Sequence, residues 1–513
     1  MKGTYFSSGG YPAEYGNALS GMLVMESKDL PSRSQYTFGT GLAALSAGAS
    51  VVVVPEKIGA SLSGNYSDTG PMFKLNRHRR TFSNYPRAFD LNVNAFYRYL
   101  PGGSVKLFLF REEDEVGIEV KNPVYGGFFQ GDSKNSLINL QMKQLITSRL
   151  FFTGNWAFSR FRRKANLNAL DLDSQENLYQ FRFVGEYRQS STLKFRGGVE
   201  WFDNRTDMQG KVPREYLDLN PEAPTDKIDL KYRSQRNTAF FQTEWRLLPR
   251  LNFFPGVRLE YESVSGDVVF DPRLSISLNL LSGLDFTLAS GVYHQFPEPY
   301  YYDPFSGNPS LKSAKSGHHI AGISYRGKNT MCRMEVYYKN YKNLLLEAQE
   351  ENFTNNGYGY ARGMDIFLKH SRKMIKGWLS YSYLNSRRYW MDAPGLTSPE
   401  FDITHNLSTV IEISLDFHWN LGFAYRYATG KPYSTSPHYY LNARVPPYKK
   451  LDVNLTYLYR FFENNLTVFY IAVSNVLGRD NIFDYYYSPD YQKREPIKST
   501  MRRTVYFGVT FSF

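Results

Sequence analysis

The sequence predicts an all-β protein, a transmembrane antiparallel β-barrel of about 22 strands with short periplasmic turns and long extracellular loops. Three observations predict this fold. Apolar and polar residues alternate with a period of two in segment after segment of the 513-residue chain. The connections between these segments alternate between short and long. The 41 Tyr, 38 Phe, 39 Gly and 25 Pro residues are typical of β structure with many turns.

Each alternating segment presents one apolar and one polar face, because successive side chains of a strand point to opposite sides. Residues 89–97, 257–262, 451–457 and 504–513 show this pattern clearly. A soluble β-sandwich alternates in the same way, so the alternation alone does not place the apolar face in a membrane.

Three further features favour lipid on the apolar face. The segments run for ~10–14 residues, longer than the ~5–6 residues usual in soluble sheets. Aromatic residues such as Tyr97 and Tyr99 cluster near segment ends, as in the aromatic belts of membrane proteins. Charged residues such as Glu244 and Arg246 lie on the polar faces. A dry core would hold these charges only at high cost, whereas a water-filled lumen holds them easily.

The number of strands follows from the connections. Ten short turns are expected near residues 55–56, 101–102, 147–148, 189–190, 248–249, 281–282, 327–328, 372–373, 414–415 and 461–462. Long loops are expected near residues 67–86, 114–134, 164–176, 205–231, 295–312, 344–357, 387–401, 428–447 and 476–499, with a shorter link near 265–270. A first strand near residues 35–45 and a last strand near 500–513 bring the tally to about 22.

Composition and charge exclude several classes of protein. The mean hydropathy is −0.46 and no run of ~20 apolar residues is present, which excludes a helical membrane bundle. The single cysteine, Cys332, excludes an internal disulfide and a Cys-based zinc site. The net charge of +13 fits nucleic acid, anionic lipid or an acidic ligand, and equally a solvated basic surface. No dense basic run accompanies it, and we expect no nucleic-acid partner.

The sequence contains no convincing signature of an enzyme. The run Gly39-x-Gly41-x-x-Ala44 is a weak dinucleotide-binding match that lies outside any βαβ unit. No nucleophile elbow, phosphate-binding loop or HExxH motif occurs. We therefore expect no enzyme, no cofactor and no metal site.

Several stretches resemble TonB-dependent outer-membrane receptors. The segment GGYPAEYGNALSGMLVMESKD at residues 9–29 looks like the end of that family's plug domain. Stretches similar to its barrel are DPRLSISLNL at 271–280, GVYHQFPEP at 291–299, NNGYGYARGMDIFLK at 355–369, FDITHNL at 401–407, TGKPY at 429–433, PYKKLDVNLTY at 447–457, VSNVLGRDN at 473–481 and the terminal GVTFSF. The terminal Phe513 resembles the signal that the barrel assembly machinery reads.

The resemblance implies two domains: a C-terminal remnant of a plug over residues 1–31 and a transmembrane barrel over residues 32–513. It implies a monomer in the cell outer membrane, in contact with lipid and lipopolysaccharide. Such a receptor binds a scarce ligand, such as a ferric siderophore or another large nutrient, at its extracellular loops. Uptake is energised by the TonB complex, whose coupling box is not found here.

The start of the chain departs from this family pattern. Residues 1–5 have no apolar core of a signal peptide, and only about 30 residues of plug precede the barrel. We therefore expect an N-terminally truncated receptor. Two other functions stay open: a passive outer-membrane diffusion channel, which needs no plug, and a structural or adhesin-type barrel whose loops bind partners.

The candidate ligand-binding residues are aromatic residues of the expected outer loops, because tyrosine offers a rigid apolar face and a hydroxyl group. They are Tyr300, Tyr301, Tyr302, Asp303, Tyr439, Tyr440, Tyr485, Tyr486 and Tyr487. The alternative interpretation is an interfacial belt or simple loop packing. His294, His318 and His319 were considered for a metal-bearing ligand. The neighbours His318 and His319 are expected to point to opposite faces of a strand, which makes them a poor chelate.

Overall fold

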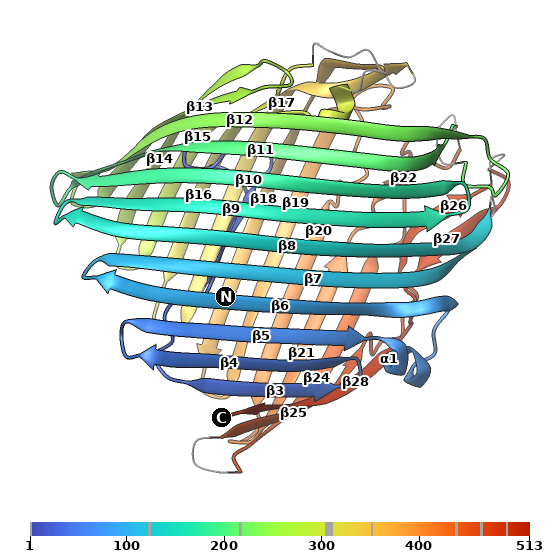
Figure 1. Cartoon of the computed structure of the whole chain (residues 1–513), viewed down its shortest axis with the longest axis horizontal. Coiled ribbons are helices and arrows are strands. Elements are labelled where there is room, and N and C mark those ends of the chain that lie inside the picture. Colours follow the sequence, from blue (N-terminus) through green and yellow to red (C-terminus); the bar gives the residue numbers. More distant parts are fainter. Residues whose placement is uncertain are drawn as a thin grey trace.

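The chain forms a closed barrel of 22 antiparallel strands, as the alternation predicts (Figure 1). A computed structural model describes residues 3–121, 125–214, 218–302, 311–349, 352–436, 440–461, 465–488 and 491–513. Each barrel strand pairs with its neighbour along the sheet, and β28 pairs with β3 to close the ring.

The barrel strands are β3 (Gln35–Gly41), β4 (Ala44–Val54), β5 (Ile58–Asp68), β6 (Phe82–Leu100), β7 (Gly103–Lys121), β8 (Gly126–Thr147), β9 (Leu150–Leu167), β10 (Leu170–Arg188), β11 (Leu193–Pro213), β12 (Thr225–Leu248), β13 (Leu251–Glu262), β14 (Val268–Leu281), β15 (Leu284–Gln295), β16 (Ala314–Arg326), β17 (Thr330–Gln349), β18 (Asn352–Arg372), β19 (Ile375–Tyr389), β20 (His405–Ser414), β21 (Trp419–Ala428), β24 (Tyr448–Tyr459), β25 (Leu466–Ser474) and β28 (Thr504–Ser512).

Six short strands among the described residues form three small sheets that are separate from the barrel wall. They pair as β1 (Gly3–Ser7) with β2 (Met22–Glu26), β22 (Pro432–Tyr433) with β23 (Ala443–Arg444), and β26 (Ile482–Tyr487) with β27 (Arg494–Lys498). The described helices are α1 (Gly70–Leu75) and the 3₁₀ turn η1 (Pro299–Tyr302). Among the described residues, no helix combines the length and hydrophobicity that a membrane crossing requires.

The two ends of the barrel differ, as the alternation of short and long connections predicts. The ten predicted short turns fall in the links between hairpin strands at one end, although residues 462–464 of the tenth lie outside the described residues. The opposite end carries α1 and the sheets β22–β23 and β26–β27 (Figure 1). The backbone of Phe513 exchanges two hydrogen bonds with Tyr36 of β3, which extends the closing seam.

The strands are longer than the sequence predicts. Residues 114–134 and 164–176 were expected to be long loops, but strands run through most of both segments, and only residues 168–169 separate β9 from β10. The longest strand, β12, has 24 residues. Charged residues are frequent in these extensions, and neighbours such as Asp114 and Glu115 place charge on both faces of β7 where it leaves the apolar band. The backbone ladder nevertheless continues, for example from Glu115 to Asp132.

The two faces of the wall have opposite character. Trp156 and Phe241 are large side chains that stay 42% and 49% exposed on the outer face. Asn155, the strand neighbour of Trp156, points inward and accepts a hydrogen bond of 2.9 Å from the Gln141 amide. An apolar outer face and a polar inner face are what a barrel in lipid with a wet lumen requires.

Replacing Phe241 by lysine tests this assignment. A lysine inside the lipid-facing band is expected to lower the free energy of unfolding by about 2–4 kcal/mol, because the ammonium group loses its hydration. The measurement is a denaturant titration of the chain folded in lipid vesicles. The control Phe241→Leu keeps an apolar side chain. Equal stability of the lysine and leucine variants would contradict a lipid-facing position.

Candidate functional site

The N-terminal segment, residues 3–34, precedes β3 and lies against the inner wall of the barrel. Its backbone carbonyl groups are bound by cationic side chains of the wall. Arg273 of β14 donates to the carbonyl oxygens of Pro12 at 2.8 Å and Tyr15 at 2.5 Å. Arg258 of β13 donates to the carbonyl of Glu14 at 3.2 Å. These contacts hold the backbone of the segment whatever its side chains are.

A lysine and a histidine hold the same segment further along the wall. Lys339 of β17 donates to the carbonyl of Ser20 at 2.7 Å, and a second contact reaches the Ser8 carbonyl. The Nε2 atom of His318 lies 2.9 Å from the Leu19 carbonyl, which can only accept. His318 is fully buried, and the ring of Tyr293 stacks on it at 4.1 Å.

The charged side chain of Glu14, in the middle of the segment, also contacts the wall. Glu14 lies 2.6 Å from Arg182 and 2.7 Å from Arg196, and all three side chains are largely shielded from water. The ring of Tyr11 is buried and packs edge-on against Tyr293 at 4.6 Å. The segment is therefore fixed by charge pairing and by packing as well as by its backbone.

Behind these contacts lies a buried network of charged groups. Arg258 is only 2% exposed and lies 2.9 Å from Glu200 and 2.8 Å from Glu260. Each of these side chains belongs to the inner wall and none reaches bulk water. Arg182 and Arg236 extend the network, at 3.1 Å from Glu200 and 3.7 Å from Glu260. Removal of one partner would therefore weaken the compensation of the buried charges that remain.

The three histidines considered from the sequence go to different places. His318 faces the lumen, whereas His319 points outward and pairs with the Ser290 hydroxyl at 3.0 Å, which confirms the predicted opposite orientations. His294 lies 2.5 Å from the Asp271 carboxylate. The described residues contain no group of three or more His, Cys, Asp and Glu side chains arranged to hold a metal ion.

At the long-connection end, two of the predicted tyrosines come together in an aromatic cluster. Tyr485 and Tyr487 of β26 share one face of their strand and lie beside Tyr433 of β22, with ring centroids 4.9 and 6.5 Å away. Arg494 of β27 stacks over the Tyr485 ring at 4.4 Å and donates to the Tyr433 hydroxyl at 3.1 Å. Tyr491 packs on Tyr487 at 4.7 Å.

We call this group, Tyr433, Tyr485, Tyr487, Tyr491 and Arg494, the mouth cluster. Sequence analysis missed Tyr433, Tyr491 and Arg494, although Tyr433 ends the TGKPY stretch that resembles the family. No sequence signal joins β22 to β26, because the two strands belong to different loops.

The ion pair between Lys431 and Asp484, at 2.5 Å, ties these loops together. Burial alone would lower the pKa of Lys431, but the Asp484 carboxylate outweighs it and raises that pKa.

The other predicted tyrosines do not join the mouth cluster. Tyr301 packs edge-on against Phe353 at 5.0 Å, and the Tyr302 hydroxyl donates to the Leu311 carbonyl at 2.9 Å. Tyr440 donates to Asp392 at 3.1 Å. Burial raises the pKa of both the Tyr302 and Tyr440 hydroxyls, so that they stay protonated donors. Tyr486 points to the opposite face of β26.

Two of the predicted ligand-binding residues, Asp303 and Tyr439, lie outside the described residues. Of Tyr300, in η1, only the backbone is described. Among the predicted tyrosines whose side chains the structure describes, Tyr485 and Tyr487 of β26 are the two that come together.

A polar cavity of about 1300 Å³ separates the N-terminal segment from the opposite wall. Strands β3 to β11 line it, largely with uncharged polar side chains such as Asn94, Asn139 and Gln180. Its basic side chains include Lys106, which donates to the Ser27 carbonyl at 2.6 Å and lies 3.2 Å from Asp29. The segment thus fills one side of the lumen and leaves a wet space on the other.

A closed 22-strand barrel with a polar lumen and an internal segment defines the class of outer-membrane-type β-barrels. The family model "TonB dependent receptor-like, beta-barrel" matches residues 54–476. Because this match covers most of the chain, the chain belongs to the TonB-dependent receptor-like β-barrel family. The family and its fold are those of transporter receptors, and the fold is characteristic of the outer membrane.

Solved structures of this family have the same fold. The ferric-catecholate import receptor Fiu from K12 E. coli aligns with a TM-score of 0.79 and 11% identity, over 98% of this chain and 85% of that chain. The FrpB iron transporter from Neisseria meningitidis (F3-3 variant) gives 0.76 and 12%, over 99% and 87%. The siderophore receptor PirA from Pseudomonas aeruginosa gives 0.68 and 14%, over 98% and 85%. None of the curated protein sequences matches this chain.

Proposed function

We propose that this chain is an outer-membrane receptor that binds a large, scarce ligand at its extracellular loops for TonB-coupled uptake. A ferric siderophore is the ligand class that we favour. The observation that carries this proposal is the mouth cluster, which gathers tyrosine rings and an arginine at the loop end of a barrel of this family. Solved structures with the same fold include receptors named for ferric-catecholate and siderophore import.

The chemistry of the mouth cluster suits a ligand of mixed polarity. Tyrosine rings offer flat apolar faces at low entropic cost, and their hydroxyl groups bind oxygen-rich groups. The guanidinium of Arg494 adds a positive charge that attracts an anionic or aromatic ligand. A ferric catecholate combines aromatic rings with negative charge, and it would therefore match this cluster.

The domain assignment and the partners belong to the same proposal. The binding of residues 8–20 by wall cations supports the assignment of residues 1–31 to the C-terminal part of a plug domain. We further propose that Phe513 is read by the barrel assembly machinery and that the protein is a monomer in contact with lipid and lipopolysaccharide. Its role is binding and transport, without covalent chemistry.

The double substitution Tyr485→Ala/Tyr487→Ala tests ligand binding at the mouth cluster. Affinity for a ferric tris-catecholate is expected to fall roughly tenfold or more, because buried aromatic contacts dominate binding energy. Tryptophan fluorescence quenching of the purified chain measures this affinity. A ferric hydroxamate, cobalamin and haem complete the ligand panel.

The matched control is Tyr187→Ala/Tyr325→Ala, which removes two exposed tyrosines near the short-turn end of the barrel. This control should bind as the unchanged chain does. If both double variants bound the ferric catecholate equally well, the mouth cluster would not be the binding site. If no member of the panel bound to the unchanged chain, the proposed ligand class would be wrong.

The second candidate function is passive diffusion, and the polar cavity of about 1300 Å³ is the observation that favours it. Single-channel conductance of the chain in a planar bilayer separates the two functions. A large, steady conductance without ligand would favour the channel. A closed barrel that takes up or releases ligand only with the TonB complex would favour the receptor.

A further inference from the structure

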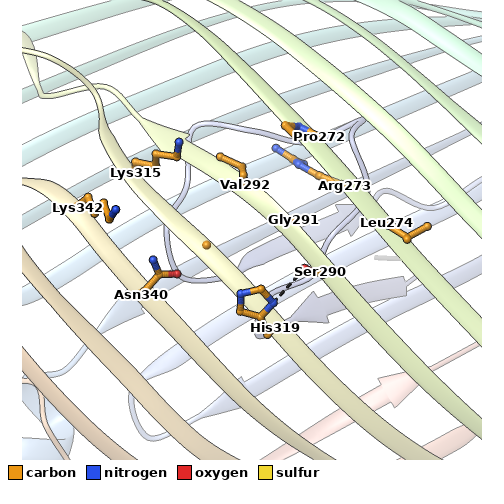
Figure 2. A pocket seen from close by; sticks show the side chains of 11 residues that line it. Pro272, Arg273, Leu274, Ser290, Gly291, Val292, Lys315, His319, Asn340 and Lys342 are labelled. Carbon is orange, nitrogen blue, oxygen red and sulfur yellow. Dashed lines mark hydrogen bonds between the residues drawn. The ribbon is translucent and has the colours of Figure 1, made fainter.

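The outer face of the wall carries two adjoining hollows along strands β14 to β17, with volumes of about 510 and 580 Å³. Leu274, Ser290 and His319 line both hollows, so that the two form one continuous groove. We call it the wall groove. Figure 2 shows its upper part, with Lys315 and Lys342 at one end, His319 at the other and Asn340 between them.

The alternation of side chains places the wall groove on the outside of the barrel. His318 and Lys339 reach into the lumen, where they bind the carbonyls of the N-terminal segment. Their strand neighbours His319 and Asn340 therefore point the other way, toward the membrane. The groove does not open into the lumen and is separate from the mouth cluster.

The upper part of the wall groove is cationic and can donate hydrogen bonds. Lys315 and Lys342 are register partners on β16 and β17, so both ammonium groups emerge side by side. Gly317 is the register partner of Asn340, and any Cβ there would collide with the Asn340 side chain. The missing side chain at Gly317 leaves the hollow between the lysines and His319.

The lower part of the wall groove is apolar. Its outward-facing side chains are mainly aliphatic: Leu274, Ile276, Leu288, Ala321 and Val336. Tyr338 stands at its edge and stacks on Tyr360 of β18, with ring centroids 6.5 Å apart. Tyrosines of this kind mark the level where lipid chains meet headgroups. The two lysines lie on the loop side of this level, near the start of β16.

The charge of the upper part is uncompensated. Neither Lys315 nor Lys342 forms an ion pair within the described part of the chain, and no acidic side chain lines either hollow. On the opposite wall, two outward-facing basic side chains at a similar level have carboxylate partners. Lys134 lies 3.4 Å from Glu113, and Arg162 lies 2.5 Å from Asp173. The wall groove therefore combines two positive charges that are available to bind an anion with an adjoining apolar track.

We propose that the wall groove binds one phosphate-bearing lipid of the outer leaflet. The phosphate lies between Lys315 and Lys342, with Asn340 and His319 as further donors, and an acyl chain runs along the aliphatic part. Two features carry this inference: cations without partners, and an apolar track that continues from them toward the membrane interior. The proposal rests on the proposed contact with outer-membrane lipid and lipopolysaccharide, but it does not depend on which ligand the mouth cluster binds.

The test uses the full chain, folded and purified in a mild detergent, and titrates it with lipid A carrying two phosphates. Native mass spectrometry counts the bound lipid. The double variant Lys315→Gln/Lys342→Gln is expected to bind this lipid roughly 30-fold more weakly, since each basic group near an anionic headgroup contributes roughly a five- to sixfold factor. Lipid A without phosphates should bind the unchanged chain and this variant alike.

The matched control, Lys134→Gln/Lys231→Gln, makes the same change in net charge at exposed lysines that already have acidic partners. It should bind lipid A as the unchanged chain does. Equal loss in both double variants would mean that only the overall charge matters, and would overturn the site. No loss in Lys315→Gln/Lys342→Gln would overturn it as well.

A second variant tests the apolar track without altering charge. Ala321→Phe fills the lower hollow and is expected to weaken binding of the phosphorylated lipid, while unchanged binding would refute a chain in the groove. Inorganic phosphate in excess should fail to displace the lipid, because it gains nothing from the track. Displacement by phosphate alone would show a free-anion site in place of a lipid site. Circular dichroism confirms that each variant is folded.

Discussion

Replacing Arg258 by methionine is expected to lower the free energy of unfolding by about 3–5 kcal/mol. Arg258 is 2% exposed and neutralises Glu200 and Glu260, which are themselves buried. Methionine fills a similar volume but removes the cation that the two carboxylates share. Glu200 then keeps its contact with Arg182 at 3.1 Å, and Glu260 its contact with Arg236 at 3.7 Å. The loss therefore reflects the weakened compensation of the buried charges more than the lost packing. Guanidinium titration of the chain folded in vesicles measures it.

Two controls separate this effect from a general loss of charge. The variant Arg111→Gln breaks an exposed pair, since Arg111 is 58% exposed beside Glu113, and should cost less than about 1 kcal/mol. The triple variant Arg258→Met/Glu200→Met/Glu260→Met removes these three charges and leaves Arg182 paired with Glu14. It is expected to recover part of the stability, because Arg236 loses its contact with Glu260. If Arg258→Met proved as mild as Arg111→Gln, the network would not stabilise the barrel.

Replacing Gly16 by alanine is expected to loosen the N-terminal segment while the barrel stays intact. A Cβ at this position would overlap the Nε atom of Arg258 and the Oε1 atom of Glu260. Both groups are locked in the buried network and cannot move away without breaking it. Such overpacking typically costs about 1–3 kcal/mol. Amide hydrogen exchange of residues 9–20 should therefore speed up by roughly 5- to 150-fold.

The matched control is Gly3→Ala, because a Cβ at residue 3 has no heavy atom within 4 Å. Its exchange rates should equal those of the unchanged chain. The exchange of amides in β12 and β13 reports on the barrel and should stay slow in both variants. Unchanged protection of residues 9–20 in Gly16→Ala would show that the segment does not depend on its close approach to the wall.

The charged inner wall explains why the N-terminal segment is held so tightly by so few residues. Arg258, Arg273 and Lys339 donate to backbone carbonyls, which every sequence offers. Glu14 adds a side-chain contact that is specific to this segment. Water-filled lumens solvate charges well, but residues 8–20 cover these cations and shield them from that water. Charge pairing and carbonyl contacts offset the lost hydration.

Much of the architecture was predictable, because strand structure is encoded locally. The period-two alternation and the ten short turns depend on neighbouring residues only, and they predict about 22 strands, the number that the barrel has. The opposite orientations of His318 and His319 follow from the same alternation. The extent of the strands was not predictable. The extensions that include Glu115 and Asp132 look like loops in the sequence, because charged residues are frequent there and interrupt the apolar face.

The sites depend on contacts between residues that are far apart in the sequence. Tyr485 was a candidate, but its partners Tyr433 and Arg494 became visible only once β22, β26 and β27 were placed in space. The hydrogen bond from Lys339 to the Ser20 carbonyl also became visible only in the three-dimensional structure. So did the strand register that places Lys315 beside Lys342.

By itself the sequence determined the class of fold, the polar and apolar faces of the wall and the alternation of turns and loops, because these features arise from the local geometry of a strand. Only the tertiary structure decided which wall cations hold residues 8–20, which tyrosines form the mouth cluster and where two lysines stand without an acidic partner. The physical reason is the closure of the barrel, which sets strand register and thereby brings distant side chains within a few ångströms of one another.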